Sequence, residues 1–143
     1  PIIISTGMAD LVDISEAIDV CKKVGNNQIC LLHTSSLYPT MPEDVNILNI
    51  LKLSKIFGLP VGLSDHSLGN LLIQYAISAG SSIVEKHFTL TRNQEGPDHS
   101  LSAEPAMLKE IVVQSKKIKK IFGEEFLGIR NSENSAKIFR RSS

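Results

Sequence analysis

Residues 60–66 read PVGLSDH, a short apolar run that ends in a polar and ionisable cluster. A helix-length segment, residues 68–79, follows it and stops at Gly80. A short apolar run followed by a helix of about a dozen residues is typical of one βα unit in a parallel sheet. In such sheets the ligand site lies at the carboxyl ends of the strands. The polar cluster at residues 64–66 is therefore predicted to lie at a binding edge.

The same order of strand, polar cluster and helix occurs four times in the chain. The predicted strands cover residues 2–5, 29–32, 60–63 and 82–84, and the predicted helices cover residues 14–24, 48–57, 68–79 and a segment that starts after Pro105. Parallel neighbours in a sheet need a crossover connection, which these helices supply. The sequence thus predicts an α/β fold with parallel strands, all of which carry polar residues at the same end.

Composition excludes several classes of function. The chain has 143 residues, of which 42% are hydrophobic, and its 15 basic residues balance its 15 acidic ones. A balanced charge gives no general attraction to nucleic acid or to an anionic membrane, so small-molecule partners are expected. No apolar run approaches the roughly 18 residues of a membrane span, and a cytoplasmic location is the expectation. The opening Pro1-Ile2 lies inside a predicted strand, which suggests a piece of a longer protein.

The two cysteines are expected to remain free thiols. Cys21 falls on the buried face of a predicted helix and Cys30 lies inside a predicted strand. Cysteine in such settings behaves as a small hydrophobic residue. No disulfide is therefore predicted.

All four histidines follow predicted strands: His33, His66, His87 and His99. His66 and His87 stand at the tips of consecutive strands, so their rings are close enough to share one divalent metal ion. Histidine pairs with nearby carboxylates suit manganese, zinc or iron. The alternative for each histidine is a structural, hydrogen-bonded role.

Glu85 is the carboxylate expected to share a direction with His87, because side chains alternate along a strand. It is a candidate for orienting a substrate hydroxyl or for proton transfer, with pairing to a basic residue as the alternative. Lys86, between them, is expected on the opposite face, in a salt bridge or against a helix. The lysines of residues 116–120 are interpreted as a solvated helix face.

Small polar residues after the strands have two interpretations. Ser36, Ser64 and their neighbours can hold a phosphate or carboxylate, or they can complete turns. Asp98 lies in a GPDH turn with the same two alternatives, and Tyr38 either closes over a site or packs.

Together these motifs resemble the N-acylneuraminate (sialic acid) synthase family over essentially the whole chain. The resembling segments are ISTGMA (4–9), LLH (31–33), YP (38–39), EDVN (43–46), GLSDH (62–66), EKHFTL (85–90) and GPDH (96–99). The resemblance implies that residues 1–124 are strands five to eight of a (β/α)8 TIM barrel. It also implies that residues 125–143 are a linker towards an antifreeze-like C-terminal domain, which family members lend to a partner subunit in a homodimer.

The resemblance further implies an aldol-like condensation. C3 of phosphoenolpyruvate attacks the open-chain aldehyde of N-acetylmannosamine or a related N-acyl amino sugar, water adds at C2, and phosphate leaves. By the same resemblance, His66 and His87 hold a divalent metal, usually Mn²⁺, that polarises the aldehyde oxygen. The product is a nonulosonic acid of the neuraminate, legionaminate or pseudaminate type.

The remaining site residues also follow from the resemblance. Ser64 is expected to contact phosphoenolpyruvate, and Tyr38, Glu85 and Asp98 are expected to face the sugar. Ser36 stands where family members often have asparagine in contact with phosphoenolpyruvate, so a shorter side chain or a water does that work here. The GPDH turn favours neuraminate or legionaminate.

Two other functions stay open from the sequence. A half barrel exposes strand edges and apolar surface, so the chain alone is expected to be inactive and either to associate or to be poorly stable. A non-catalytic remnant that acts as a structural or binding module is one alternative. Metal-dependent hydrolysis on a barrel is the other, and no further motif supports it.

Overall fold

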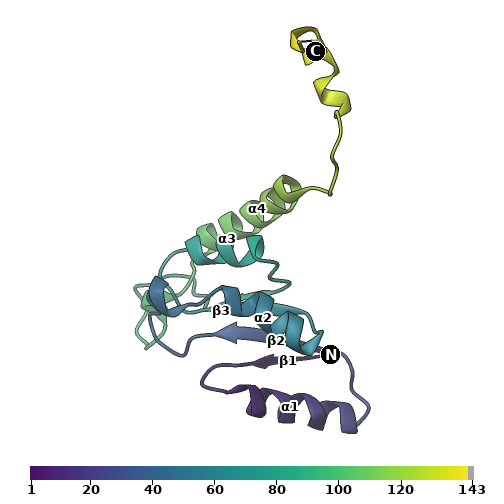
Figure 1. The fold of residues 1–143 in the computed structure, drawn as a ribbon. Coiled ribbons are helices and arrows are strands. Elements are labelled where there is room, and N and C mark those ends of the chain that lie inside the picture. Colours follow the sequence, from purple (N-terminus) through teal and green to yellow (C-terminus); the bar gives the residue numbers. More distant parts are fainter. Residues whose placement is uncertain (142–143) are drawn as a thin grey trace.

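The structure, a computed structural model, describes residues 1–141 and contains a sheet of parallel strands (Figure 1). The strands pair in chain order as β1 (Ile2–Ser5), β2 (Ile29–Thr34), β3 (Val61–Asp65) and β4 (Val84–Lys86). The crossover helices are α1 (Leu11–Lys23), α2 (Leu48–Phe57) and α3 (Leu71–Ser78), and α4 (Pro105–Phe122) follows β4. Short 3-10 helices span Pro42–Asp44, His99–Leu101 and Asn131–Phe139. The predicted α/β class with parallel strands is confirmed.

Helix α1 begins at a capping box. The Asp10 carboxylate accepts hydrogen bonds from the backbone N–H groups of Val12 (2.7 Å) and Asp13 (3.0 Å), and the Asp13 carboxylate accepts from Asp10 N–H (3.0 Å). Such a cap stabilises a helix by about 1 kcal/mol. The cap fixes where α1 begins after the turn that follows β1.

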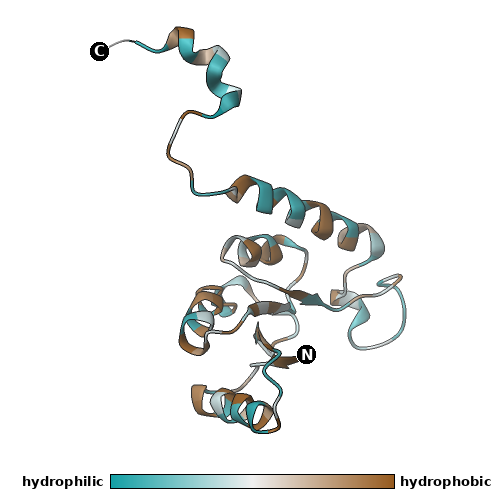
Figure 2. Ribbon diagram, turned by 90° about the vertical axis from the view of Figure 1, so that its right-hand side faces the viewer, coloured by the Kyte–Doolittle hydropathy of each residue, from teal (hydrophilic) through white to brown (hydrophobic). Residues whose placement is uncertain are grey.

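The hydrophobic core lies between one face of the sheet and helices α1, α2 and α3. Its members are Ile14, Ile18, Ile29, Leu31, Val45, Ile50, Leu53, Val61, Leu63, Leu72 and Ala76. Fully burying a side chain such as Leu31 contributes about 1.5–3 kcal/mol. In Figure 2 the strands are mostly brown and hydrophobic, with a teal end on one of them, while α4 carries separate brown and teal faces. Alternate strand residues face the other side of the sheet, where the polar site lies.

Strands β2, β3 and β4 extend further along the chain than predicted. β2 reaches Thr34, β3 reaches Asp65, and β4 covers residues 84–86 instead of 82–84. The polar residues stay in the strands because neighbouring strands and side chains satisfy their hydrogen bonds. Helix α3 begins at Leu71, later than the predicted residue 68, because Gly69 adopts a positive φ of 80° that interrupts a helix.

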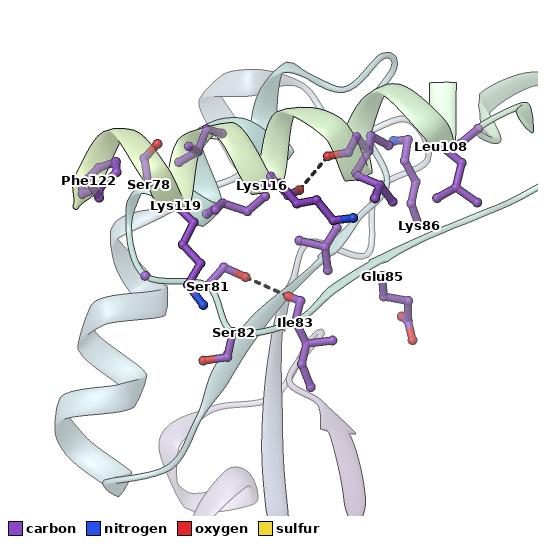
Figure 3. Close-up of a pocket in the computed structure, with 18 of the residues that line it drawn as sticks. Ser78, Ser81, Ser82, Ile83, Glu85, Lys86, Leu108, Lys116, Lys119 and Phe122 are labelled. Carbon is purple, nitrogen blue, oxygen red and sulfur yellow. Dashed lines mark hydrogen bonds between the residues drawn. The ribbon is translucent and has the colours of Figure 1, made fainter. Parts of the chain in front are cut away.

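A wide groove runs beside β4, the last strand of the sheet. It has a volume of about 1090 Å³ and lies between β4, the end of α3 and helix α4 (Figure 3). Its apolar lining includes Phe88, Leu108, Val112 and Phe122, which are all exposed. This groove is where the sheet of a closed barrel would continue.

Residues 125–141 extend away from the βα units (Figure 1). They are exposed throughout, and residues 131–139 form a 3-10 helix where the sequence showed no clear period. Ser142 and Ser143, the end of the expected linker, lie outside the described residues. Within the described part, no helix is both long and apolar enough to cross a membrane.

Cys21 and Cys30 are free thiols, as predicted. Burial raises the pKa of the Cys30 thiol above its ordinary value, since the charged thiolate is poorly solvated inside the protein. A raised thiol pKa lowers the thiolate fraction, which fits a packing role for Cys30.

Gly62 allows β3 to lie close to its neighbours, and we expect Gly62→Ala to destabilise the protein by about 1–3 kcal/mol. An added Cβ would collide with the carbonyl oxygen of Ile83 and would lie 2.7 Å from Leu32 Cδ2. The backbone of β4 cannot move aside without losing the hydrogen bond from Leu63 N–H to Ile83 O (2.9 Å). Urea unfolding would measure the loss, with the exposed helix variant Lys55→Ala as control. Equal midpoints for the two variants would contradict the expectation.

Candidate functional site

The candidate site lies at the carboxyl ends of β3 and β4. Parallel pairing places Ser64 opposite Glu85. His66 and His87 lie two residues further along the chain, just past the ends of the two strands. The Ser64 hydroxyl donates to Glu85 Oε1 at 2.7 Å. The imidazole rings of His66 and His87 have centroids 5.4 Å apart. This separation agrees with the expectation that the rings of His66 and His87 lie close together at the tips of consecutive strands.

His66 is held in one tautomer by the backbone. Its Nδ1 lies 2.8 Å from the carbonyl oxygen of Ser35, which can only accept, so Nδ1 carries the hydrogen. The lone pair is then on Nε2, which faces Tyr38 Oη at 3.2 Å and Ser64 Oγ at 3.4 Å. Sequence reasoning could not identify the Ser35 carbonyl, because a backbone group leaves no signal in the residue type.

Tyr38 packs directly against the histidine pair. Its ring stacks on His66 with centroids 4.1 Å apart and 22° between the planes, and it meets His87 edge-on at 5.6 Å. Its side chain is still about half exposed. The structure places Tyr38 beside the two histidines, and both alternatives predicted for it, closing over a site or packing, remain open.

Asp98 and Ser36 lie at the margin of the cluster. Asp98 Oδ2 is 4.0 Å from His87 Nδ1, too long for a hydrogen bond, and both side chains are partly exposed. Ser36 adjoins the site through Ser35, and its hydroxyl lies over the tip of β1, where a Cβ added to Gly7 would be 2.5 Å away. Gly7 therefore leaves the space that the Ser36 hydroxyl occupies.

The other two histidines do not join the site. His33 is buried on the helix side of β2, where its Nε2 is 2.6 Å from the carbonyl oxygen of Val45. His99 Nδ1 is 2.7 Å from Thr89 Oγ1 in the loop after β4. Both have the structural, hydrogen-bonded role that was the alternative from the sequence.

Lys86 forms the salt bridge expected from strand alternation. Its Nζ donates to Asp65 Oδ2 at 2.8 Å, and the side chains of Lys86 and Asp65 are only 4% and 2% exposed. In Figure 3, Lys86 and Glu85 point to opposite sides of β4. Lys86 therefore faces away from the histidine pair.

The donor set of the histidine pair fits a divalent metal. Neutral imidazole binds a metal through the nitrogen that lacks hydrogen, and a hydrogen bond from the other nitrogen to a carbonyl is the usual outer support. His66 has this arrangement. Within residues 1–141, no cluster of three or more His, Cys, Asp or Glu side chains is placed to hold an ion. Water, substrate or another part of the protein would supply the remaining ligands.

Four parallel strands that alternate with helices have the layout of one half of a (β/α)8 barrel. In such barrels the polar side chains of the site lie at the carboxyl ends of the strands, as the histidine pair, the carboxylate and the hydroxyls do here. The model of the NeuB family matches residues 1–126. The chain belongs to the NeuB family.

Curated relatives and a solved structure agree with this assignment. N,N'-diacetyllegionaminic acid synthase of Campylobacter jejuni is 42% identical over 94% of this chain and 40% of its own length. Pseudaminic acid synthase of Helicobacter pylori is 40% identical over 87% of this chain and 37% of its own length. The N-acetylneuraminic acid (sialic acid) synthetase structure from Leptospira borgpetersenii superposes with a TM-score of 0.85 and 36% identity, covering 96% of this chain and 48% of that one.

These matches confirm the family and the TIM-barrel class of the fold. They also show how much of its relatives' length the chain covers. It spans about two fifths of the length of the two synthases. The names of these relatives describe enzymes that make legionaminic, pseudaminic and N-acetylneuraminic acids.

Proposed function

We propose that this chain supplies strands five to eight, over residues 1–124, of a synthase that condenses phosphoenolpyruvate with N-acetylmannosamine or a related N-acyl amino sugar. The observation that carries the proposal is the cluster at the tips of β3 and β4, where the His66 and His87 rings lie 5.4 Å apart beside the Ser64–Glu85 hydrogen bond. Proteins named as synthases of legionaminic, pseudaminic and N-acetylneuraminic acids resemble this chain in sequence or fold. The product is a nonulosonic acid, with release of phosphate.

In the proposed site, His66 and His87 hold a divalent ion, with Mn²⁺ as the expected metal. When bound, the ion acts as a Lewis acid toward the aldehyde oxygen of the sugar. The chain keeps His66 ready for this role, because the Ser35 carbonyl fixes the hydrogen on Nδ1 and leaves the lone pair on Nε2. The Tyr38 hydroxyl lies 3.2 Å from that nitrogen. When the nitrogen binds the metal instead, the hydroxyl can turn toward the substrate.

Glu85 is proposed to handle a proton or orient a hydroxyl of the sugar. Its carboxylate is exposed on the open side of the sheet, and among the residues that the structure describes only Ser64 holds it, at 2.7 Å. A carboxylate with one oxygen anchored and the other open can accept a proton from a substrate hydroxyl or an attacking water. Ser64 and Ser36 are proposed to contact phosphoenolpyruvate, and Tyr38 and Asp98 to face the sugar.

The chain by itself is proposed to be inactive. Half of the barrel's strand ends are absent, and the groove beside β4 leaves an unpaired strand edge and exposed apolar side chains. Residues 125–143 are proposed to link the barrel to an antifreeze-like domain, which completes the partner's site in a homodimer.

The test compares this chain with a complete barrel, meaning this chain joined to a segment that supplies the other four βα units. Each is incubated with phosphoenolpyruvate, Mn²⁺ and one of several N-acyl amino sugars, and phosphate and nonulosonic acid are measured. We expect phosphate release by the complete barrel only when the sugar is present, with one product molecule per phosphate. Phosphate release without sugar would favour hydrolysis, and no reaction with any sugar would favour a non-catalytic module.

A further inference from the structure

The ion pair between Asp65 and Lys86 is part of a closed network behind the site. Lys86 Nζ donates to Asp65 Oδ2 at 2.8 Å and to the carbonyl oxygen of Ser67 at 2.7 Å. The other carboxylate oxygen, Asp65 Oδ1, accepts from Ser67 N–H at 2.9 Å and from Ser67 Oγ at 2.6 Å. The ammonium and the carboxylate thus bind the same short segment that follows β3.

The two residues of the ion pair each lie between two candidate site residues in the sequence. Asp65 lies between Ser64 and His66, and Lys86 lies between Glu85 and His87. Asp65 and Lys86 are directly paired across the two strands. Because side chains alternate along a strand, this pair faces the helices while its neighbours face the site. One bridge therefore joins the two strand tips at the positions immediately before the histidines.

Burying the Asp65–Lys86 ion pair costs desolvation free energy, which indicates that the pair serves to fix the positions of the two strands. The Asp65 and Lys86 side chains are almost wholly buried, and removing two charges from water cancels much of their attraction. Apolar side chains of similar size often hold such a position as well or better. What they cannot do is fix distances through directed hydrogen bonds, as Lys86 does by bonding both to Asp65 and to Ser67 O.

We infer that Asp65 and Lys86 are positioning residues that hold the tips of β3 and β4 together and so set the separation of His66 and His87. The inference rests on the proposed function, since it concerns how the proposed metal ligands are placed. Neither residue touches substrate in this scheme. Their effect passes through the backbone of residues 65–67 and of β4 to the two imidazole rings.

The test measures Mn²⁺ affinity of the complete barrel by calorimetry at a temperature where every variant is folded. Lys86→Met is expected to lower both the thermal midpoint and the affinity, the latter about 10-fold, as for other supporting residues of metal ligands. Ile50→Ala, in the core at α2 and 1% exposed, is the control for lost stability. It is expected to lower the midpoint and to leave the affinity unchanged.

A double variant, Asp65→Asn with Lys86→Met, separates positioning from stability. Both buried charges are then gone, so the thermal midpoint is expected to recover, while the affinity remains about 10-fold weaker because no bridge ties Ser67 to β4. Recovery of the affinity together with the midpoint would overturn the inference. So would an unchanged affinity in Lys86→Met.

A crystal structure of the double variant provides a readout that does not depend on metal. The ring separation of His66 and His87 is expected to depart from 5.4 Å, and an unchanged separation would overturn the inference. Absence of Mn²⁺ binding by the unsubstituted barrel would instead contradict the proposed metal site, and the ring separation would still decide the positioning role.

Discussion

Replacing His87 by alanine in the complete barrel is expected to weaken Mn²⁺ binding by more than about 100-fold, and His66→Ala is expected to do the same. Loss of a residue that only supports a metal ligand costs about 10–100-fold in affinity, so loss of a ligand itself should exceed that range. The two rings have centroids 5.4 Å apart and both bind the ion in the proposed site, so each substitution removes one ligand. Calorimetric titration with Mn²⁺ in the presence of phosphoenolpyruvate measures the effect.

His33→Ala is the matched control for this experiment. His33 also follows the apolar run of its strand, but its ring is buried on the helix side and lies 2.6 Å from Val45 O. The control should reduce stability and leave Mn²⁺ affinity unchanged. If metal binds equally well to the His66→Ala and His87→Ala variants, the site assignment fails and the structural or hydrolytic alternatives gain support.

Glu85→Gln is expected to lower kcat by about 10²–10⁴-fold, the range typical of losing a general acid or base. Glutamine has the same shape and keeps an oxygen that can accept the hydrogen bond from Ser64. In the unsubstituted protein this bond is 2.7 Å long. It cannot accept a proton at neutral pH. Steady-state rates of phosphate release at saturating substrates would measure the loss.

Glu16→Gln, on the exposed surface of α1, removes the same charge far from the strand ends and is expected to leave kcat unchanged. Mn²⁺ affinity of the Glu85→Gln variant is expected to stay close to that of the unsubstituted protein. A kcat that is unchanged in Glu85→Gln would leave Glu85 with only a structural hydrogen bond to Ser64.

Local patterns sufficed to predict the architecture. Each βα unit contains its own strand run, helix period and terminating glycine, as at Gly58, whose φ of 65° ends α2. Strand alternation alone predicted that Lys86 would face away from Glu85 and His87, which the buried bridge to Asp65 confirms. These features depend on residues close together in the chain, so the sequence determines them directly.

The grouping of the histidines could not be completed from sequence. Parallel strands are buried on both faces, so β2 reads as a continuous apolar run and does not reveal which way His33 points. Strand ends were also placed too early, because Asp65 and Lys86 are satisfied by one another across the sheet. Such long-range partners are invisible until the strands are paired.

The identity between strand order and chain order has a consequence for how this chain folds. Each strand pairs with its neighbour in sequence, so each pairing closes a single crossover connection and none among the four must await a more distant segment. The four units can therefore assemble as one cooperative block during synthesis, with two open edges, at β1 and β4. Any remaining strands would close the ring at both edges together, which makes closure the step at which the protein is most exposed to aggregation.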